Sequence, residues 1–365
     1  MRVEYMDSGK RLDFLEILRV LAVLFVIWDH MVANWLDRNK QVWLPLNIIR
    51  EYVTKPLAII QDFGFLGVVI FFLISGYIIS YVMQKEGRLS FLVKRIFRIY
   101  PPLIFSIIII VIFYKLQAHF TNQVIDISQF SISKILISMT LINYLFIEQN
   151  ATNGVAWTLV IEMLFYILCF IILPLIQKYP KLAISTLTLI PFIVIFESKN
   201  FGANFFLFSA SIAYLPYLVL GQILYFVYTK RISIVVFLIF SVVNYIVIIY
   251  GIRKIHNSFY DFSSSYGVSF VYAYLIFVLA VMLQRKIYSI KITDFLAKLS
   301  YSLYLNHGVL GSFLITLCYP YIGFSGAITV SFVCIIILCC ILWKFVEEPS
   351  RHIARKLLNV YVNQK

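Results

Sequence analysis

Long apolar runs recur along the whole sequence and restrict the possible folds more than any other feature. A helix crosses the hydrocarbon of a bilayer with about 20 apolar residues at about 1.5 Å per residue. Because helices satisfy every backbone polar group inside lipid, the runs predict an all-α integral membrane protein. We expect about ten transmembrane helices, at residues 14–36, 57–82, 99–118, 156–176, 182–196, 208–228, 233–250, 266–283, 298–319 and 322–344. A further apolar run at 134–147 is interrupted by polar residues and predicts a re-entrant or interfacial segment.

The composition agrees with this class of protein. Of the 365 residues, 62% are hydrophobic and 13% are charged, and the mean hydropathy is +0.91. These values exclude a soluble domain of this size. The longest stretch outside the expected spans, 119–155, is too short to bury a core of its own. We therefore expect a single membrane domain over residues 1–365, with no appended soluble domain.

The net charge of +14 does not indicate a nucleic-acid partner, because Lys and Arg gather in alternate loops. If the N-terminus is inside, the inner segments hold 21 basic residues and the outer segments hold 9. This bias is typical of cytoplasmic loops, so both termini are predicted to be cytoplasmic. The cysteines lie inside apolar runs without metal-ligand spacing and are interpreted as packing residues: Cys169, Cys318, Cys334, Cys339 and Cys340. We expect no metal.

The first apolar run contains ionisable residues, which are costly inside a spanning helix and usually have a task there. Arg19 and His30 are eleven residues apart, which places them on one stripe of a helix and about 16 Å apart along its axis. His30 is a candidate general base for a hydroxyl proton, or a nucleophile that carries an acyl group. The alternative is a structural histidine bonded to a neighbouring helix. Asp29 is expected to point away from His30, because adjacent helix positions diverge by about 100°.

The segment KRIFRIYPP, residues 94–102, lies at the cytoplasmic end of the third expected span. Arg95 and Arg98 are three residues apart and share a helix face. Their guanidinium groups suit phosphate and predict a site for a phosphorylated cofactor. The alternative is an anchor that reaches the lipid headgroups.

Two further polar groups lie within expected spans. Glu162 follows Trp157 in WTLVIEMLFY and needs a partner, for which His30 is closer in depth than Arg19. His307, in SYSLYLNHGVL, lies near the middle of the membrane. The remaining histidines fall in loops or the tail and are expected to be solvated: His119, His256 and His352.

Together these stretches resemble acyltransferase family three, a family of membrane O-acyltransferases. The resemblance rests on RVLAVLFVIWDH at 19–30, GFLGVVIFFLISGYIIS at 64–80, KRIFRIYP at 94–101, WTLVIEMLFY at 157–166, LSYSLYLNH at 299–307 and FVEEPSRH at 345–352. Thr158 stands where the family has serine, and Glu16 stands where many members have aspartate. The six stretches occur in the family's order, and the resemblance extends from about residue 11 to residue 356, nearly the whole chain.

The resemblance implies transfer of an acyl group, most simply acetyl, from cytoplasmic acyl-CoA to a hydroxyl of a surface polysaccharide such as O-antigen or capsule. His30 would be the catalytic histidine with Arg19 as its partner, and Arg95 and Arg98 would bind the donor. The remaining motif residues would act in catalysis or support the site: Glu162, His307, Tyr304 and Ser75.

The implied location is the bacterial cytoplasmic membrane, and the implied acceptor is a carbohydrate, lipid-linked or free. The alternative functions are a transporter or flippase of a lipid-linked glycan, which would predict inverted repeats that the sequence does not show, and a membrane scaffold without chemistry.

Overall fold

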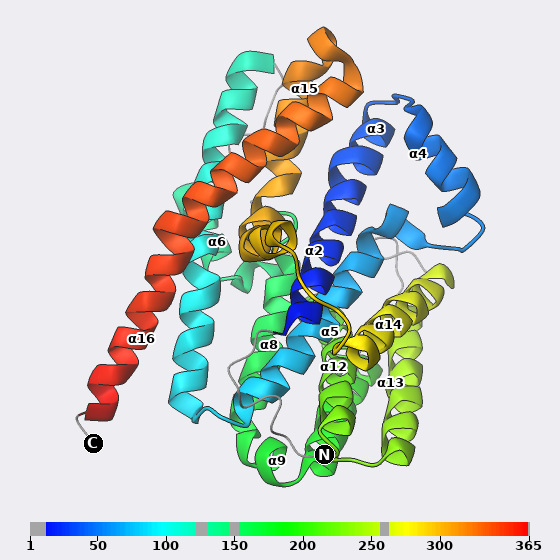
Figure 1. Ribbon diagram of the computed structural model, residues 1–365, viewed down its shortest axis with the longest axis vertical. Helices are drawn as coiled ribbons and strands as arrows, with labels where there is room; N and C mark the ends of the chain where they lie inside the picture. Colours follow the sequence, from blue (N-terminus) through cyan, green and yellow to red (C-terminus); the bar gives the residue numbers. More distant parts are fainter. Residues whose placement is uncertain (1–11, 122–129, 146–152, 256–262, 364–365) are drawn as a thin grey trace.

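The computed structural model describes residues 12–121, 130–145, 153–255 and 263–363, and within these ranges it contains helices and no strand (Figure 1). The elements are, in chain order, α2 (Asp13–Ile27), the π-helical turn η1 (Trp28–Ala33), α3 (Asn34–Arg38), α4 (Leu44–Ile49), the π turn η2 (Arg50–Thr54), the short helix η3 (Ile60–Phe63), α5 (Gly64–Met83), α6 (Arg88–Thr121), α7 (Ile132–Met139), η5 (Ile142–Leu145), α8 (Trp157–Ile171), α9 (Leu173–Lys178), α10 (Pro180–Phe196), α11 (Ala203–Ile212), α12 (Leu215–Tyr228), α13 (Ile234–Ile255), α14 (Ser265–Leu283), α15 (Lys291–Leu342), η6 (Trp343–Glu347) and α16 (Glu348–Asn363).

Helices that can cross a membrane by length and composition occur at most of the predicted positions. Six such helices lie in the described ranges, at 60–83, 88–116, 203–228, 234–255, 265–283 and 291–359. Two shorter apolar helices are Trp157–Ile171 and Pro180–Phe196. An all-α multi-pass membrane protein is thus confirmed, whereas the number of ten spans and the side of the termini remain predictions.

The longest helix, α15, is broken at Gly323, where φ is 64°. A positive φ is readily adopted by glycine alone, so the chain can reverse there. Figure 1 shows one arm of α15 leading up to this point and the second arm returning beside it toward α16. The two arms correspond to the last two predicted spans, 298–319 and 322–344.

Helix α5 lies at the centre of the molecule and packs against α2, α12 and α14. Its contact with α12 is unusually close, because each helix presents a glycine to the backbone of the other. A Cβ at Gly76 would lie 1.8 Å from the carbonyl oxygen of Leu218, and one at Gly221 would lie 2.1 Å from that of Leu73. Small residues let membrane helices approach in this way and gain dispersion contacts.

We expect Gly76→Ala to lower the thermal midpoint of the detergent-solubilised protein by several degrees. The added methyl group cannot share space with a backbone oxygen, so α5 and α12 must separate, at a cost on the order of 1–3 kcal/mol. Gly87→Ala is the matched control, because a Cβ at Gly87 has nothing within 4 Å. Equal midpoints for the two variants would contradict this description of the contact.

Candidate active site

A strongly basic cavity of about 490 Å³ opens between α2, α6, α15 and α16. Its volume lies in the range of small-molecule sites. Apart from Glu16, the charged side chains in its lining are cations, contributed by four helices far apart in sequence: Arg19, Lys94, Arg95, Arg98, Lys298, Arg351 and Arg355. We call it the basic cavity. Such a lining favours an anion with more than one charge.

Arg95 and Arg98 are cations of this lining without an ionic partner among the described residues. Neither forms an ion pair within the described part of the chain, whereas Lys94 pairs with Glu86 and Arg351 pairs with Glu347. Arg95 is 6% exposed, lies over the rings of Phe91 and Tyr166, and leaves its Nε without a hydrogen-bond partner. A buried guanidinium group with a free donor is costly unless a ligand supplies an acceptor.

The basic cavity continues into a narrower space of about 80 Å³, which we call the throat. The two spaces share Arg19, Arg95 and Arg98 in their linings. The throat adds polar groups of α5 and α8: the Ser75 hydroxyl lies 3.3 Å from the Tyr166 hydroxyl, which donates to Glu162 Oε2 over 3.1 Å. Glu162 therefore faces the arginine cluster.

A layer of hydroxyl groups closes the far end of the throat. Thr158 Oγ1 and the Tyr304 hydroxyl lie 2.9 Å apart, and Tyr304 also donates to the carbonyl of Val155 over 3.3 Å. Thr158 and Tyr304 line the throat, whereas Val155 and Leu305 line a third cavity on the other side. The two spaces are thus lined by neighbouring residues: Tyr304 and Leu305 are consecutive on α15, and Tyr304 donates to the carbonyl of Val155.

This third cavity, which we call the outer cavity, has a volume of about 380 Å³ and includes His30, Asn34 and Arg38 in its lining. The His30 side chain is about one-third exposed. Its Nδ1 lies 2.8 Å from Nε2 of His307, which is fully buried on α15. The two predicted histidines are therefore directly hydrogen-bonded.

Asp29 lies next to His30, contrary to the expectation that the two residues diverge. Asp29 Oδ2 is 3.6 Å from His30 Nε2, and Asp29 Oδ1 accepts a hydrogen bond from Asn34 Nδ2 over 2.9 Å. The cause is the π turn η1, in which the Asn34 backbone N–H bonds to the carbonyl of Asp29, five residues back. The angular step assumed from the sequence holds for an α-helix, not for a π turn.

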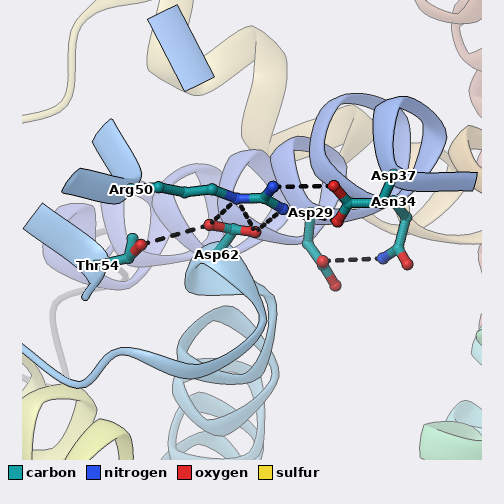
Figure 2. Close-up of polar contacts among 6 residues, drawn as sticks. All are labelled: Asp29, Asn34, Asp37, Arg50, Thr54 and Asp62. Atoms are coloured by element: carbon teal, nitrogen blue, oxygen red, sulfur yellow. Dashed lines mark hydrogen bonds and ion pairs between the residues drawn. The ribbon is translucent and has the colours of Figure 1, made fainter. Parts of the chain in front are cut away.

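Arg50 joins Asp37, on α3, to Asp62, just before α5, in an arrangement that we call the arginine clamp (Figure 2). Arg50 donates to both carboxylate oxygens of Asp37, over 2.9 and 2.7 Å, and to both of Asp62, over distances from 2.6 to 3.1 Å. The hydrogen bonds from Arg50 lower the pKa of Asp37. Asp62 has φ of 42°, a conformation that such contacts must hold in place. Gly64 lies two residues further on, and a Cβ there would overlap the side chain of Asp29.

The predicted site residues form two groups. Arg19, Arg95 and Arg98 line both the basic cavity and the throat, while His30 lines the outer cavity and His307 lies behind it. The other members of the first group line the throat: Ser75, Glu162 and Tyr304.

Glu162 lines the throat together with Arg19, whereas His30 lines the outer cavity, so the structure does not place Glu162 in the same cavity as His30, its expected partner. Glu162 instead accepts a hydrogen bond from Tyr166. Trp157, at the start of α8, is partly buried and packs against Phe72 and Tyr214.

Several residues of the site were not identified from the sequence. Asp29 was expected to point away from His30. Four cations of the basic cavity were counted only among the basic residues of the inner segments: Lys94, Lys298, Arg351 and Arg355. Glu347, from the FVEEPSRH stretch, is 2% exposed and accepts bonds from Ser302 and Arg351. The expectation for His352 is confirmed, because it is exposed; His256 and the side chain of His119 lie outside the described residues.

Comparison with known proteins agrees with this arrangement. A family model described as an acyltransferase domain matches residues 12–344. The chain belongs to acyltransferase family three. Membership in this family favours acyl transfer over the transporter and scaffold hypotheses. No solved structure matches this chain.

The curated relatives of this chain include the O-acetyltransferase OatA of Staphylococcus aureus, from strains NCTC 8325 / PS 47, COL and MRSA252. Each is 28% identical over 403 aligned positions, which cover 96% of this chain. The same alignment covers 59% of each relative, so the chain spans less than two thirds of their length.

Proposed function

We propose that this acyltransferase moves an acetyl group from acetyl-CoA, bound on the cytoplasmic side, to a hydroxyl of a surface polysaccharide on the opposite side of a bacterial cytoplasmic membrane. The observation that carries the proposal is the order of the three spaces. Unpaired arginines line the basic cavity, the throat shares these arginines, and a hydrogen-bonded histidine lines the outer cavity, whose lining residue Leu305 follows Tyr304 of the throat.

The basic cavity suits the phosphates of coenzyme A. The free donors of Arg95 and Arg98 are charge-assisted partners for phosphate oxygens, and guanidinium groups bind them in a forked geometry. Lys298 and Arg351 add positive charge around them. The throat is narrow, as a thioester arm requires, and the helical distance of about 16 Å from Arg19 to His30 is comparable to the length of that arm.

His30 suits the chemical step. As general base it takes the proton of the acceptor hydroxyl, whose oxygen bonds to the thioester carbonyl carbon. The carbon–sulfur bond then breaks, and the coenzyme A thiolate takes the proton from His30. Alternatively His30 accepts the acetyl group first and passes it on. Either route requires the Thr158–Tyr304 layer to part, so that thioester and hydroxyl meet.

The test compares the surface glycan of cells that carry the intact chain with that of cells that lack it. NMR of the purified glycan should show O-acetyl signals in the first sample and their loss in the second. Restoring the chain should restore the signals. Identical O-acetylation in the presence and absence of the chain would refute the proposal.

A further inference from the structure

The hydrogen bond between the two histidines has a direction that the structure determines. His307 Nδ1 lies 3.0 Å from the carbonyl oxygen of Leu303, one helical turn earlier on α15. A carbonyl oxygen can only accept, so His307 Nδ1 must carry the proton. In a neutral imidazole the other nitrogen is then an acceptor, and this nitrogen, Nε2, faces His30.

The same reasoning continues to His30. Because His307 Nε2 accepts, His30 Nδ1 must donate across the 2.8 Å contact. The ring planes are within 6° of parallel and the centroids are 5.0 Å apart, so the rings meet edge to edge with the two nitrogens between them. His30 Nε2 is therefore left with a free lone pair.

From this geometry we propose that His307 is a positioning residue, which holds His30 in the tautomer whose Nε2 is the base or nucleophile. The inference rests on the proposed function and assigns a role within it. His307 is fully buried and absent from the lining of the outer cavity, so it acts on an acceptor only through His30. Which nitrogen of a histidine reacts is set by the bond that the other nitrogen makes.

Two neighbours support this arrangement. A Cβ at Gly311, one turn beyond His307, would lie 2.7 Å from Met31 Sδ, so the glycine lets α15 approach the π turn that carries His30. Asp29 Oδ2 lies 3.6 Å from His30 Nε2. When Nε2 takes up a proton, this carboxylate is the nearest described anion to the new charge.

The test compares His307→Gln with His307→Ala in membranes supplied with radiolabelled acetyl-CoA and the strain's own surface glycan. A glutamine Oε1 can accept from His30 Nδ1–H, whereas glutamine does not act as a base at neutral pH. We expect His307→Gln to keep kcat within about tenfold of wild type and His307→Ala to lose about 10²-fold or more. The KM for acetyl-CoA should be unchanged in both variants, because the arginines are intact.

Two kinetic results would overturn the inference: glutamine as damaging as alanine, which would make His307 a reacting group, or alanine as active as wild type. Full activity of His30→Ala would instead refute the proposed function.

Nitrogen NMR of ¹⁵N-histidine-labelled protein gives a second test that does not depend on the folding of a His307 variant. The signal lost in His30→Ala identifies His30, and in wild type it should show a protonated Nδ1 and an unprotonated Nε2. A protonated Nε2 on neutral His30 would overturn the assignment.

Discussion

Replacing His30 by alanine should reduce acyl transfer by at least about 10²-fold while the protein still inserts and folds. A positioned general base contributes about 10²–10⁴-fold, and a histidine that carries the acyl group would be indispensable. His30 is partly exposed in the outer cavity, so its removal leaves little unfilled space in the core. The measurement is the rate of label transfer from acetyl-CoA to glycan, at matched protein levels.

His352→Ala is the control for this experiment, because His352 is an exposed histidine on α16 that lines none of the three spaces. It should leave the rate unchanged. If His30→Ala kept the wild-type rate, His30 would be a structural histidine and the chemistry would have to be assigned elsewhere.

Replacing Arg98 by alanine should raise the KM for acetyl-CoA about tenfold to a hundredfold with little change in kcat. A hydrogen bond to a charged group contributes about 1.5–3 kcal/mol, and each 1.4 kcal/mol corresponds to a factor of about ten. Arg98 is the better test than Arg95, because it is only half-buried, whereas the Arg95 guanidinium lies over the rings of Phe91 and Tyr166. The KM is measured by steady-state kinetics at varied acetyl-CoA concentration.

Lys356→Ala is the control for charge alone, since Lys356 is an exposed cation on α16 outside the basic cavity. Its KM should equal that of wild type. The donor KM of wild type should also rise with salt, because phosphate contacts are screened. An unchanged KM for Arg98→Ala would mean that the arginine anchors the helix and does not bind donor.

The helices and the main polar groups of the site were predictable because both depend on local patterns. Apolar runs mark helices in a membrane protein, and ionisable residues inside them stand out as costly. His30, His307 and Glu162 were identified in this way. The sequence did not predict which of these residues lie together, because the hydrogen bond between His30 and His307 joins residues 277 positions apart.

Three features depended on local geometry that the sequence does not encode plainly. The π turn brings Asp29 beside His30, where an α-helix would separate them. The packing of Trp157 against Phe72 accompanies the placement of Glu162 in the throat beside the arginines. Arg50 binds both Asp37 and Asp62, whereas from the sequence it was counted only as one of the basic residues.

The central claim is that donor and acceptor are bound on opposite sides of the Thr158–Tyr304 layer. Its most direct test is the sidedness of transfer in sealed membrane vesicles, with radiolabelled acetyl-CoA added outside. Everted vesicles, which present the basic cavity, should incorporate label into glycan ester, and right-side-out vesicles should not until they are permeabilised. Equal incorporation by intact vesicles of both orientations would contradict the account.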